Sequence, residues 1–384
     1  MMRPTDSPAA ADDDVAPLTC SAVLTHHWLV RRRGGERVLA ALGELLPESP
    51  IFTLVHDPAG LGDWSLARRP VHTSWLQRCP GARRHYPKLL PLMPHAARRM
   101  RLPPVDLVVC SDAALAKAMV PDARSRVVCY CHSPMRYVWD LADEYGRTLP
   151  ALLRRLWPTL CARLRAADRA AAQRVDVFVA NSHHVADRVR RHYGRDARVV
   201  YPPVDLPDAD GGRPPRREDF LLCVGYHVPY KRLDLAVAAA AAVRRPLVVI
   251  GEGPDVARLR ATAPGDVTWL GWQPDETIRN CYRRAAALLF PGEEDFGIVP
   301  VEAMAQGCPV VAYGVGGAAE TVVPDVTGVL VATQTVDALV RGLHQALARD
   351  WDPAAMRRHA AAFGRRRFLR EMRDLLMGAL EQRG

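Results

Sequence analysis

The chain has 384 residues, of which 49% are hydrophobic and 24% charged, a length that predicts two domains and a composition that excludes a disordered protein. Its formal net charge of +10 is concentrated in the first half, because residues 1–200 carry 30 Lys and Arg against 19 Asp and Glu. Nine cysteines show no CxxC pair and no zinc-type Cys/His spacing, so we interpret them as core residues of a protein in a reducing cytoplasm. No stretch has the length and hydropathy of a transmembrane helix.

Residues 1–18 are rich in Pro, Ala and Asp and lack the basic start and apolar core of a signal peptide, so we expect a disordered lead. Short apolar runs then alternate with helical patterns. In the first half the predicted strands are Ser21–Leu24, Ile51–Val55, Leu107–Cys110, Val127–Tyr130, Val177–Ala180 and Val199–Tyr201. In the second half they are Phe220–Val224, Pro246–Ile250, Val267–Leu270, Ala287–Phe290, Val310–Ala312 and Gly328–Val331. Helical patterns include Glu36–Leu46, Leu233–Val243 and Pro300–Ala305.

Unbroken apolar strands separated by helices predict parallel sheets that are covered on both faces. A segment rich in Pro, Gly and charge, residues 204–219, separates the two series and is predicted to be a linker. We therefore expect two Rossmann-like, doubly wound α/β domains, residues 19–203 and 220–360, that face each other across a cleft. Residues 361–384 are expected to form a C-terminal helix that packs back on the N-terminal domain.

The strongest candidate site is the string FPGEEDFGIVPVEAMAQGCPVVA over residues 290–312. A predicted strand is followed by acidic residues, by Gly297, which lets backbone approach a ligand, and by the start of a helix. Glu294 and Glu302 stand on either side of this corner, and carboxylates suit sugar hydroxyls because each accepts charge-strengthened hydrogen bonds. The free N–H groups of the helix start suit a phosphate. The alternative is a solvated acidic turn.

Two basic turns are candidate diphosphate sites. Lys231 and Arg232 follow the first predicted strand of the second half, and the alternative for them is surface charge at a helix start. Lysine occurs only at Lys88, Lys117 and Lys231, which indicates that a compact ammonium is needed there. In the first half, the three arginines 31–33 precede Gly34 and Gly35, whose backbone would approach a phosphate at a helix N-terminus without forming the GxGxxG fingerprint.

His132 follows the strand that ends at Tyr130, so its side chain is expected to point into the cleft and to contact a sugar. The alternative is a structural histidine. Asp208 and Asp210 have the spacing of a DxD metal motif, but they lie in the predicted linker with no strand before them, and we expect no metal site.

Together these strings resemble glycosyltransferase family 4, whose members have the GT-B fold. Glu294 and Glu302 match the EX7E motif of that family, and Lys231 stands where its diphosphate-binding lysine stands. The resemblance is closest to a bacterial branch typified by O-antigen mannosyltransferases. The resemblance to this branch is based on the strings Gly34–Glu36, Cys131–Tyr137, Tyr230–Asp234 and Glu293–Pro300. Gly316, Gly317 and Glu320 also fit the family pattern.

The resemblance implies a retaining transferase that needs no metal and no cofactor. It would move a sugar, expected to be mannose from GDP-mannose, onto a hydroxyl of a glycan or lipid-linked acceptor in envelope polysaccharide synthesis. Glu302 would hold the donor ribose, Glu294 the donor sugar and Lys231 the leaving diphosphate, with His132 beside the sugar. The catalytic residues implied are His132, Glu294 and Lys231, and the donor-binding residues are Gly34, Gly35, Lys231, Arg232, Glu294, Phe296, Gly297, Ile298, Val299 and Glu302.

Tyr226 departs from this pattern, because related sequences carry an arginine just after the first glycine of the same turn. Arg232 or one of the arginines 31–33 is expected to replace that charge. The alternatives are a catalytically silent GT-B partner subunit and another GT-B enzyme, such as a sugar-nucleotide epimerase or a phosphorylase.

The segment Arg68–Arg101 has nine basic residues, no acidic one, and interleaved aromatic and apolar side chains. This pattern suits an anionic membrane surface, and the alternative is a solvated basic face. No nucleic-acid-binding motif accompanies the charge, so nucleic acid is not expected as a partner. The sequence therefore predicts a cytoplasmic protein that is peripheral on the inner face of the membrane.

Overall fold

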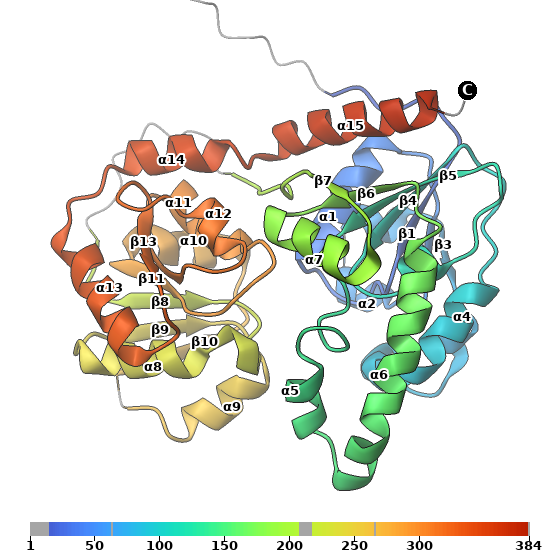
Figure 1. The fold of residues 1–384 in the computed structure, drawn as a ribbon. Helices are drawn as coiled ribbons and strands as arrows, with labels where there is room; N and C mark the ends of the chain where they lie inside the picture. The colour runs from blue at the N-terminus through green and yellow to red at the C-terminus, as the bar shows by residue number, and fades with distance from the viewer. Residues whose placement is uncertain (1–14, 63, 207–216, 265, 383–384) are drawn as a thin grey trace, which may run out of the picture.

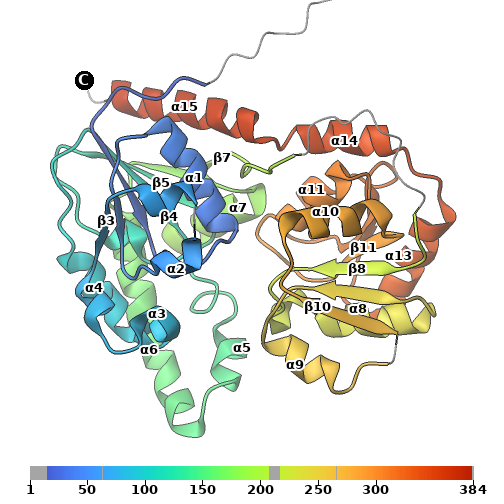
Figure 2. The same cartoon turned by 180° about the vertical axis from the view of Figure 1, so that it is seen from behind.

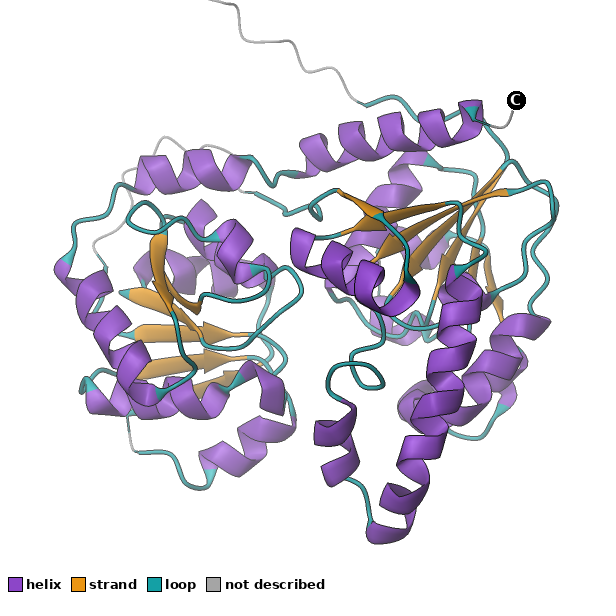
Figure 3. Cartoon of the chain, in the orientation of Figure 1, coloured by secondary structure: helices purple, strands orange, loops and turns teal. Residues whose placement is uncertain are grey.

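The computed structural model describes residues 15–62, 64–206, 217–264 and 266–382. They form two α/β domains, each built on one parallel sheet with helices on both faces (Figure 1, Figure 3). The first sheet has seven strands in the order β3-β2-β1-β4-β5-β6-β7, and the second has six in the order β10-β9-β8-β11-β12-β13. Because the strand order reverses beside β1 and β8, ligand crevices are expected outside the carboxyl ends of these central strands.

The strands confirm the twelve predicted apolar runs, and no strand end differs from its predicted position by more than two residues. In the first sheet they are β1 (Ala22–His26), β2 (Ile51–Thr53), β3 (Val71–Thr73), β4 (Leu107–Asp112), β5 (Arg126–Cys131), β6 (Val177–Ala180) and β7 (Ala197–Val199). In the second they are β8 (Leu221–Val224), β9 (Leu247–Ile250), β10 (Val267–Gly271), β11 (Ala287–Phe290), β12 (Val310–Tyr313) and β13 (Gly328–Val331). The edge strand β3 was not predicted, because it is short, largely exposed and carries no apolar run.

The helices of the first domain are α1 (Gly34–Leu45), α2 (Pro58–Leu61), α3 (Ala82–His85), α4 (Met93–Arg99), α5 (Ala142–Arg147), α6 (Ala151–Ala172) and α7 (His183–Tyr193). Those that follow are α8 (Leu233–Ala242), α9 (Pro254–Arg260), α10 (Asp275–Arg284), α11 (Ile298–Ala305), α12 (Ala318–Thr321), α13 (Val336–Ala348), α14 (Pro353–Ala361) and α15 (Arg365–Glu381). Alternate residues along each central strand pack into separate apolar clusters on its two faces.

The C-terminal helix α15 packs on the first domain (Figure 1, Figure 2). Its apolar residues recur at helical spacing, and Phe368, Met372 and Leu376 are fully buried against α1 and the first sheet. The ring of Phe368 meets Tyr130 of β5 edge to face at 5.7 Å. The chain therefore passes between the domains twice, once after β7 and once between α14 and α15.

The two passages touch each other. Val204 donates its N–H to the carbonyl of Phe363 (3.0 Å) and pairs with Gly364 as an isolated β-bridge. On the other side of the predicted linker, Arg217 donates to the carbonyl of Ala285 (2.7 Å), so this end of the linker is fixed to the second domain. Residues 207–216 lie outside the described part of the chain.

The prediction that residues 1–18 are disordered is wrong for residues 15–18, which contact the first domain. Leu18 donates its N–H to the carbonyl of Leu45 (2.8 Å), and Val15 and Leu18 pack against the cluster that contains α1 and α15. This apolar contact adds residues 15–18 to the first domain, whereas residues 1–14 lie outside the described part of the chain.

A buried ionic triad supports the end of β4. The ammonium of Lys117 lies 2.9 Å from Asp112 and 2.6 Å from Asp168, and all three side chains are fully buried. Asp168 also accepts hydrogen bonds from the indole of Trp139 (2.9 Å) and the hydroxyl of Tyr193 (2.8 Å). Burial acts to lower the pKa of Lys117, but the two aspartates outweigh it and hold that pKa well above its ordinary value.

Candidate active site

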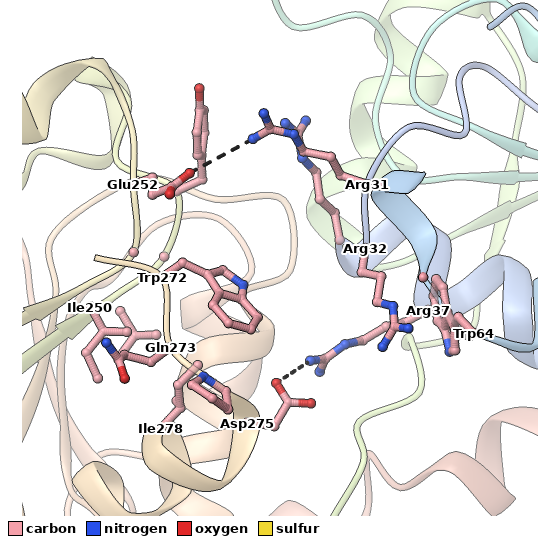
Figure 4. Close-up of a pocket in the computed structure, with 18 of the residues that line it drawn as sticks. Arg31, Arg32, Arg37, Trp64, Ile250, Glu252, Trp272, Gln273, Asp275 and Ile278 are labelled. Carbon is pink, nitrogen blue, oxygen red and sulfur yellow. Dashed lines mark hydrogen bonds and ion pairs between the residues drawn. The ribbon is translucent and has the colours of Figure 1, made fainter. Parts of the chain in front are cut away.

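The carboxyl ends of the two sheets face each other and enclose a cavity of about 930 Å³ between the domains. One wall carries Arg31, Arg32 and Arg37 from the loop before α1 and its first turn, and the side chains of Arg31 and Arg37 reach toward the second domain (Figure 4). Arg32 instead donates to the carbonyl of Leu61 (2.6 Å) in the first domain. The other wall includes Glu252, after β9, and Asp275, at the start of α10, which pair with Arg31 (4.0 Å) and Arg37 (3.5 Å). The arginines of the first wall suit a polyanionic ligand.

The first turn of α1 closely approaches the second domain at Gly34, which has no side chain, and the first-domain residue His132 at Gly35. A Cβ at Gly34 would lie 3.0 Å from Cδ1 of Ile298, in the first turn of α11. A Cβ at Gly35 would lie 3.5 Å from Nε2 of His132. The structure therefore brings together residues that the sequence analysis placed in separate motifs, at the meeting point of two helix N-termini.

Glu302 is held by the first domain. Its carboxylate accepts a hydrogen bond from Nη1 of Arg37 (2.9 Å) and another from the hydroxyl of Tyr282 (3.2 Å). Burial raises the pKa of Glu302, and the Arg37 guanidinium opposes this shift. Tyr282 was missed by the sequence analysis, because its partner is remote in the chain and it belongs to no local motif, whereas Arg37 directly follows the predicted string Gly34–Glu36.

Lys231 and Glu294 form an ion pair of 2.8 Å beside the cavity. Burial acts to lower the pKa of Lys231, but the charge of Glu294 outweighs it, so the pKa is raised and the side chain is an ammonium at neutral pH. Nζ of Lys231 lies 3.4 Å from where a Cβ of Gly225 would stand, and Gly225 lines the cavity. The ammonium is thus placed next to the cavity, at the carboxyl end of β8.

Arg232 does not join Lys231. Its guanidinium pairs with Asp234 (2.9 Å) and lines a second cavity of about 420 Å³, together with Arg136 and Glu293. The structure instead brings an arginine of the first domain to Tyr226: the guanidinium of Arg33 lies 5.3 Å from the centre of its half-exposed ring, at the rim of the larger cavity.

His132 is the end of a hydrogen-bonded row of buried side chains. Its Nε2 lies 2.8 Å from the hydroxyl of Ser111, which lies 3.1 Å from Nδ1 of His26, and Nε2 of His26 is 3.7 Å from Glu36. Burial and the neighbouring His26 lower the pKa of His132 to about 3, so its imidazole is neutral at physiological pH. Sequence reasoning missed His26 and Ser111, whereas Glu36 stands in the predicted string Gly34–Glu36.

The acidic string holds the domains together as well as lining the cleft. Asp295 accepts a hydrogen bond from Arg188 of α7 (2.5 Å), and its carbonyl accepts one from Ser182 (2.6 Å). Arg136, in the loop after β5, donates to the carbonyl of Glu293 (3.0 Å). The strings after β5 and β11, predicted separately, thus contact each other across the cleft, whereas Arg188 carried no local sequence signal.

A second carboxylate connects the domains at the N-terminus of α7. Glu320, in α12, accepts hydrogen bonds from the backbone N–H groups of His183 (2.9 Å) and His184 (2.8 Å). A carboxylate is favourable there because the first N–H groups of a helix have no partner within the helix and carry partial positive charge.

The remaining predicted donor residues lie at the start of α11. Gly297 precedes the helix with a φ of +83°, a left-handed conformation that glycine adopts without strain, and Ile298 and Val299 are half-buried in its first turn. Phe296 is different: its side chain is only 3% exposed and packs against Tyr201 and Phe363. That side chain is part of the core, which leaves only its backbone for a ligand.

Within the described residues, no group of three His, Cys, Asp or Glu side chains is arranged to hold a metal ion. Asp208 and Asp210 lie outside the described part of the chain. The nine cysteines form no disulfide. No described helix combines the length and apolarity that crossing a bilayer requires.

Comparison with known proteins adds two family models, which together match most of the chain. The model of glycosyl transferases group 1 matches residues 209–366, and the model of Glycosyltransferase Family 4 matches residues 32–207. The chain is similar to D-inositol 3-phosphate glycosyltransferases of Nocardiopsis dassonvillei (32% identical; 56% of this chain, 58% of the relative) and Gordonia bronchialis (32%; 58% of each). The chain spans about half the length of the curated relatives it matches.

Solved structures resemble the whole two-domain arrangement. The Anabaena protein HepE, solved in complex with UDP-glucose, is 18% identical with a TM-score of 0.62, and the match covers 94% of this chain and 100% of that chain. Sucrose-phosphate synthase from Thermosynechococcus elongatus is 21% identical with a TM-score of 0.61, over 94% of this chain and 98% of that chain. At these identities the likeness shows the fold.

Proposed function

Because this chain belongs to glycosyltransferase family 4 and has the GT-B fold, we propose that it transfers a sugar from a nucleotide diphosphate sugar to a hydroxyl acceptor, with retention of configuration and without a metal ion. The observation that carries this proposal is the cavity of about 930 Å³, whose arginines come from one domain and whose facing loops come from the other. GDP-mannose is the expected donor. A UDP-sugar is the second candidate, because HepE was solved with UDP-glucose.

The cations of the site are suited to the leaving diphosphate. Arg31, Arg33 and Arg37 line the cavity, and the ammonium of Lys231 lies beside it. Negative charge grows on the diphosphate as the bond to the sugar breaks, so fixed cations and helix N-termini lower the energy of the transition state more than that of the bound donor. In this way the chain's own residues can supply the electrostatic stabilisation that a metal ion supplies elsewhere.

Glu302 and Glu294 are proposed to bind hydroxyls of the donor ribose and the donor sugar. Each carboxylate is held by one cation: Glu302 by Arg37 and Glu294 by Lys231. These ion pairs hold both carboxylates in fixed orientations. When the donor binds, its diphosphate attracts the two cations and its hydroxyls donate hydrogen bonds to the two carboxylates. The cation and the carboxylate of each ion pair then both contact the same ligand.

The proposed reaction breaks the bond between the anomeric carbon and the diphosphate oxygen and forms a bond from the same carbon to the acceptor oxygen on the same face. The acceptor proton passes to the departing diphosphate oxygen. His132 is neutral at physiological pH and is therefore proposed as a hydrogen-bonding partner of the sugar, not as a proton source. Contact between the domains excludes water, which limits hydrolysis of the donor.

Tyr226 motivates the competing hypothesis of a silent partner subunit. The position of Arg33 over its ring favours activity instead, because it delivers a positive charge from the first domain to this turn. The acceptor is proposed to be a glycan or lipid-linked alcohol of envelope polysaccharide synthesis, and the names of the relatives add inositol phosphate as an acceptor to be screened.

A thermal-shift panel of GDP-, UDP-, dTDP- and ADP-sugars, with their nucleoside diphosphates, tests the proposal. A ligand at about a hundred times its Kd stabilises the protein by about 2.7 kcal/mol. We expect one base to stabilise the wild type, and Glu302→Ala and Lys231→Ala to lose that shift. Glu276→Ala, at an exposed position of α10, is the control and should keep it. Release of the nucleoside diphosphate with screened acceptors then measures transfer; no stabilisation by any nucleotide contradicts the proposal.

A further inference from the structure

The turn between α5 and α6 projects from the first domain. In both views this helical hairpin extends away from the sheet and ends in the turn at residues 148–150 (Figure 1, Figure 2). The first six residues of α6 are exposed, and the helix contributes no fully buried side chain before Cys161. About 9 Å of helix thus lies beyond the core, at a rise of about 1.5 Å per residue, before Trp157 and Leu160 pack against it.

The exposed end of α6 carries three leucines on one face. Leu152, Leu153 and Leu156 are 73%, 51% and 59% exposed, at spacings that place them side by side on the helix. Scattered apolar residues are normal on a protein surface, but a contiguous group on a projecting helix is typical of an interaction site. The residues expose apolar surface without contributing to the core of this domain, so folding of the first domain does not explain them.

The hairpin holds its own shape. The indole of Trp157 donates to the carbonyl of Ala142 (2.7 Å), and Arg154 donates to the carbonyls of Arg147 (3.2 Å) and Leu149 (3.1 Å). These hydrogen bonds join α6 to the end of α5 across the turn. The leucines are therefore presented on a preformed support rather than on a flexible loop, which lowers the entropy cost of docking.

The surroundings of the leucines are mainly basic. From residue 145 to residue 167 there is no acidic residue, and Arg147, Arg154, Arg155 and Arg163 lie in this stretch. Helix α4, at the end of the basic segment 68–101, packs against α6, and its Arg98 and Arg99 are exposed. Asp143 and Glu144, in the first turn of α5, are acidic residues of the same hairpin, so the surroundings of the leucines are mainly but not wholly basic. Apolar side chains in mainly basic surroundings suit an anionic lipid surface.

The basic segment itself supplies only a small apolar surface, from Trp75 and Leu92, which are 38% and 44% exposed. Leu76 and Met93 are buried in the first-domain core, and Leu89 and Leu90 pack against it. One of its cations is also used internally: Arg69 donates to the carbonyls of Leu46 (2.9 Å) and Ser49 (3.0 Å). The interleaved apolar residues that suggested membrane insertion are mainly core residues, whereas most of the basic side chains remain exposed.

We propose that the tip of the α5–α6 hairpin docks on an anionic phospholipid bilayer. Leu152, Leu153 and Leu156 would enter the boundary between headgroups and acyl chains, and the arginines around them would lie at the level of the phosphates. The exposed cations of residues 68–101 add long-range attraction. This surface is distinct from the cavity between the domains, and its binding to lipid needs neither a donor nor sugar transfer.

Vesicle flotation tests the proposal with the full chain. The wild type is compared on vesicles of phosphatidylcholine and of phosphatidylcholine with about 30% phosphatidylglycerol. The first variant combines Leu152→Ser, Leu153→Ser and Leu156→Ser, with Val326→Ser as control at an exposed apolar position of the second domain. The second combines Arg83→Glu and Arg155→Glu, with Arg341→Glu on α13 as control.

We expect the wild type to float with the anionic vesicles, and the triple leucine variant to bind roughly tenfold more weakly. The charge-reversed variant should lose the preference for phosphatidylglycerol, and both controls should bind as the wild type does. Unchanged circular dichroism and thermal unfolding of the leucine variant would show that it folds. Binding of that variant equal to the wild type overturns the proposal, as does absence of wild-type binding. A dimer by light scattering that the leucine substitutions dissociate, with vesicle binding unchanged, assigns the patch to a second copy instead.

Discussion

Replacing Lys117 by methionine removes the only cation of the buried triad. Methionine keeps the length and apolar stem of the side chain, so the change leaves Asp112 and Asp168 facing each other without a counter-ion in a dry site. Asp168 keeps its hydrogen bonds from Trp139 and Tyr193, and the structure thus isolates the effect of the missing charge. The variant is expected to fold less stably.

The size of the loss follows from the burial of all three groups. Breaking a fully buried pair by removing one partner costs about 3–5 kcal/mol, a large part of the roughly 5–15 kcal/mol that stabilises a typical domain. The pKa of Asp112 is held well below its ordinary value, with burial opposing and Lys117 prevailing. A lowered carboxylate pKa stabilises the fold above the unfolded value, about pH 4, and this contribution is lost as the pH falls further.

Urea unfolding of the full chain, followed by circular dichroism, measures this loss at pH 7 and at about pH 3, below the pKa of an aspartate in the unfolded chain. The exposed lysine of the same chain provides the matched control, because Lys88→Met removes a charge from the surface. We expect Lys117→Met to lose about 3 kcal/mol or more relative to Lys88→Met at pH 7, and a smaller difference at acidic pH. Equal stability of the two variants at pH 7 would refute the reasoning. In Lys117→Met combined with Asp112→Asn and Asp168→Asn, part of the stability should return.

Three further predictions concern the site. Arg33→Ala should raise the Kd of the donor about tenfold by loss of one charge-assisted contact, and Tyr226→Arg in that background should restore it, as measured by calorimetry. His132→Ala should lower kcat/KM about a hundredfold without changing its pH dependence between pH 5 and 8, because an imidazole whose pKa is about 3 does not titrate there; a lost acidic limb would contradict this. Glu320→Ala should weaken contact between the domains by about 1–3 kcal/mol and increase the radius of gyration in solution scattering, whereas Glu276→Ala should not.

The strands could be predicted from the sequence, because each central strand is covered on both faces and forms an unbroken apolar run. Among the longer helices, α1, α8 and α15 were predicted, whereas α6, α7, α10 and α13 were not named from the sequence. The strand β3 escaped this reasoning since its residues, Val71–Thr73, are mostly exposed. The residues of the predicted motifs converge on one cleft because the carboxyl ends of parallel strands meet at one edge of each sheet.

The contacts between the domains could not be predicted in this way. Arg37, Arg188 and Glu320 act through partners more than a hundred positions away, so no spacing connects them with the motifs they contact.

The membrane prediction also depended on tertiary structure that the sequence does not show. Tyr86, Leu89 and Leu90 look like one half of an amphipathic surface in the sequence, and only the fold shows that they pack on the core.

The double passage of the chain between the domains has a consequence for how the cleft opens. Because the two passages touch at Val204 and Gly364, both covalent connections between the domains run through one place, which can act as the pivot of a rotation. Rotation about that pivot moves the far ends most, where α9 and the α5–α6 hairpin lie on opposite sides of the gap (Figure 1). If the hairpin is bound to a bilayer, the first domain stays in place and the second domain rotates relative to it. The cleft between the domains then opens along the lipid surface. Donor from solution and acceptor from the membrane would then enter the same gap from different directions.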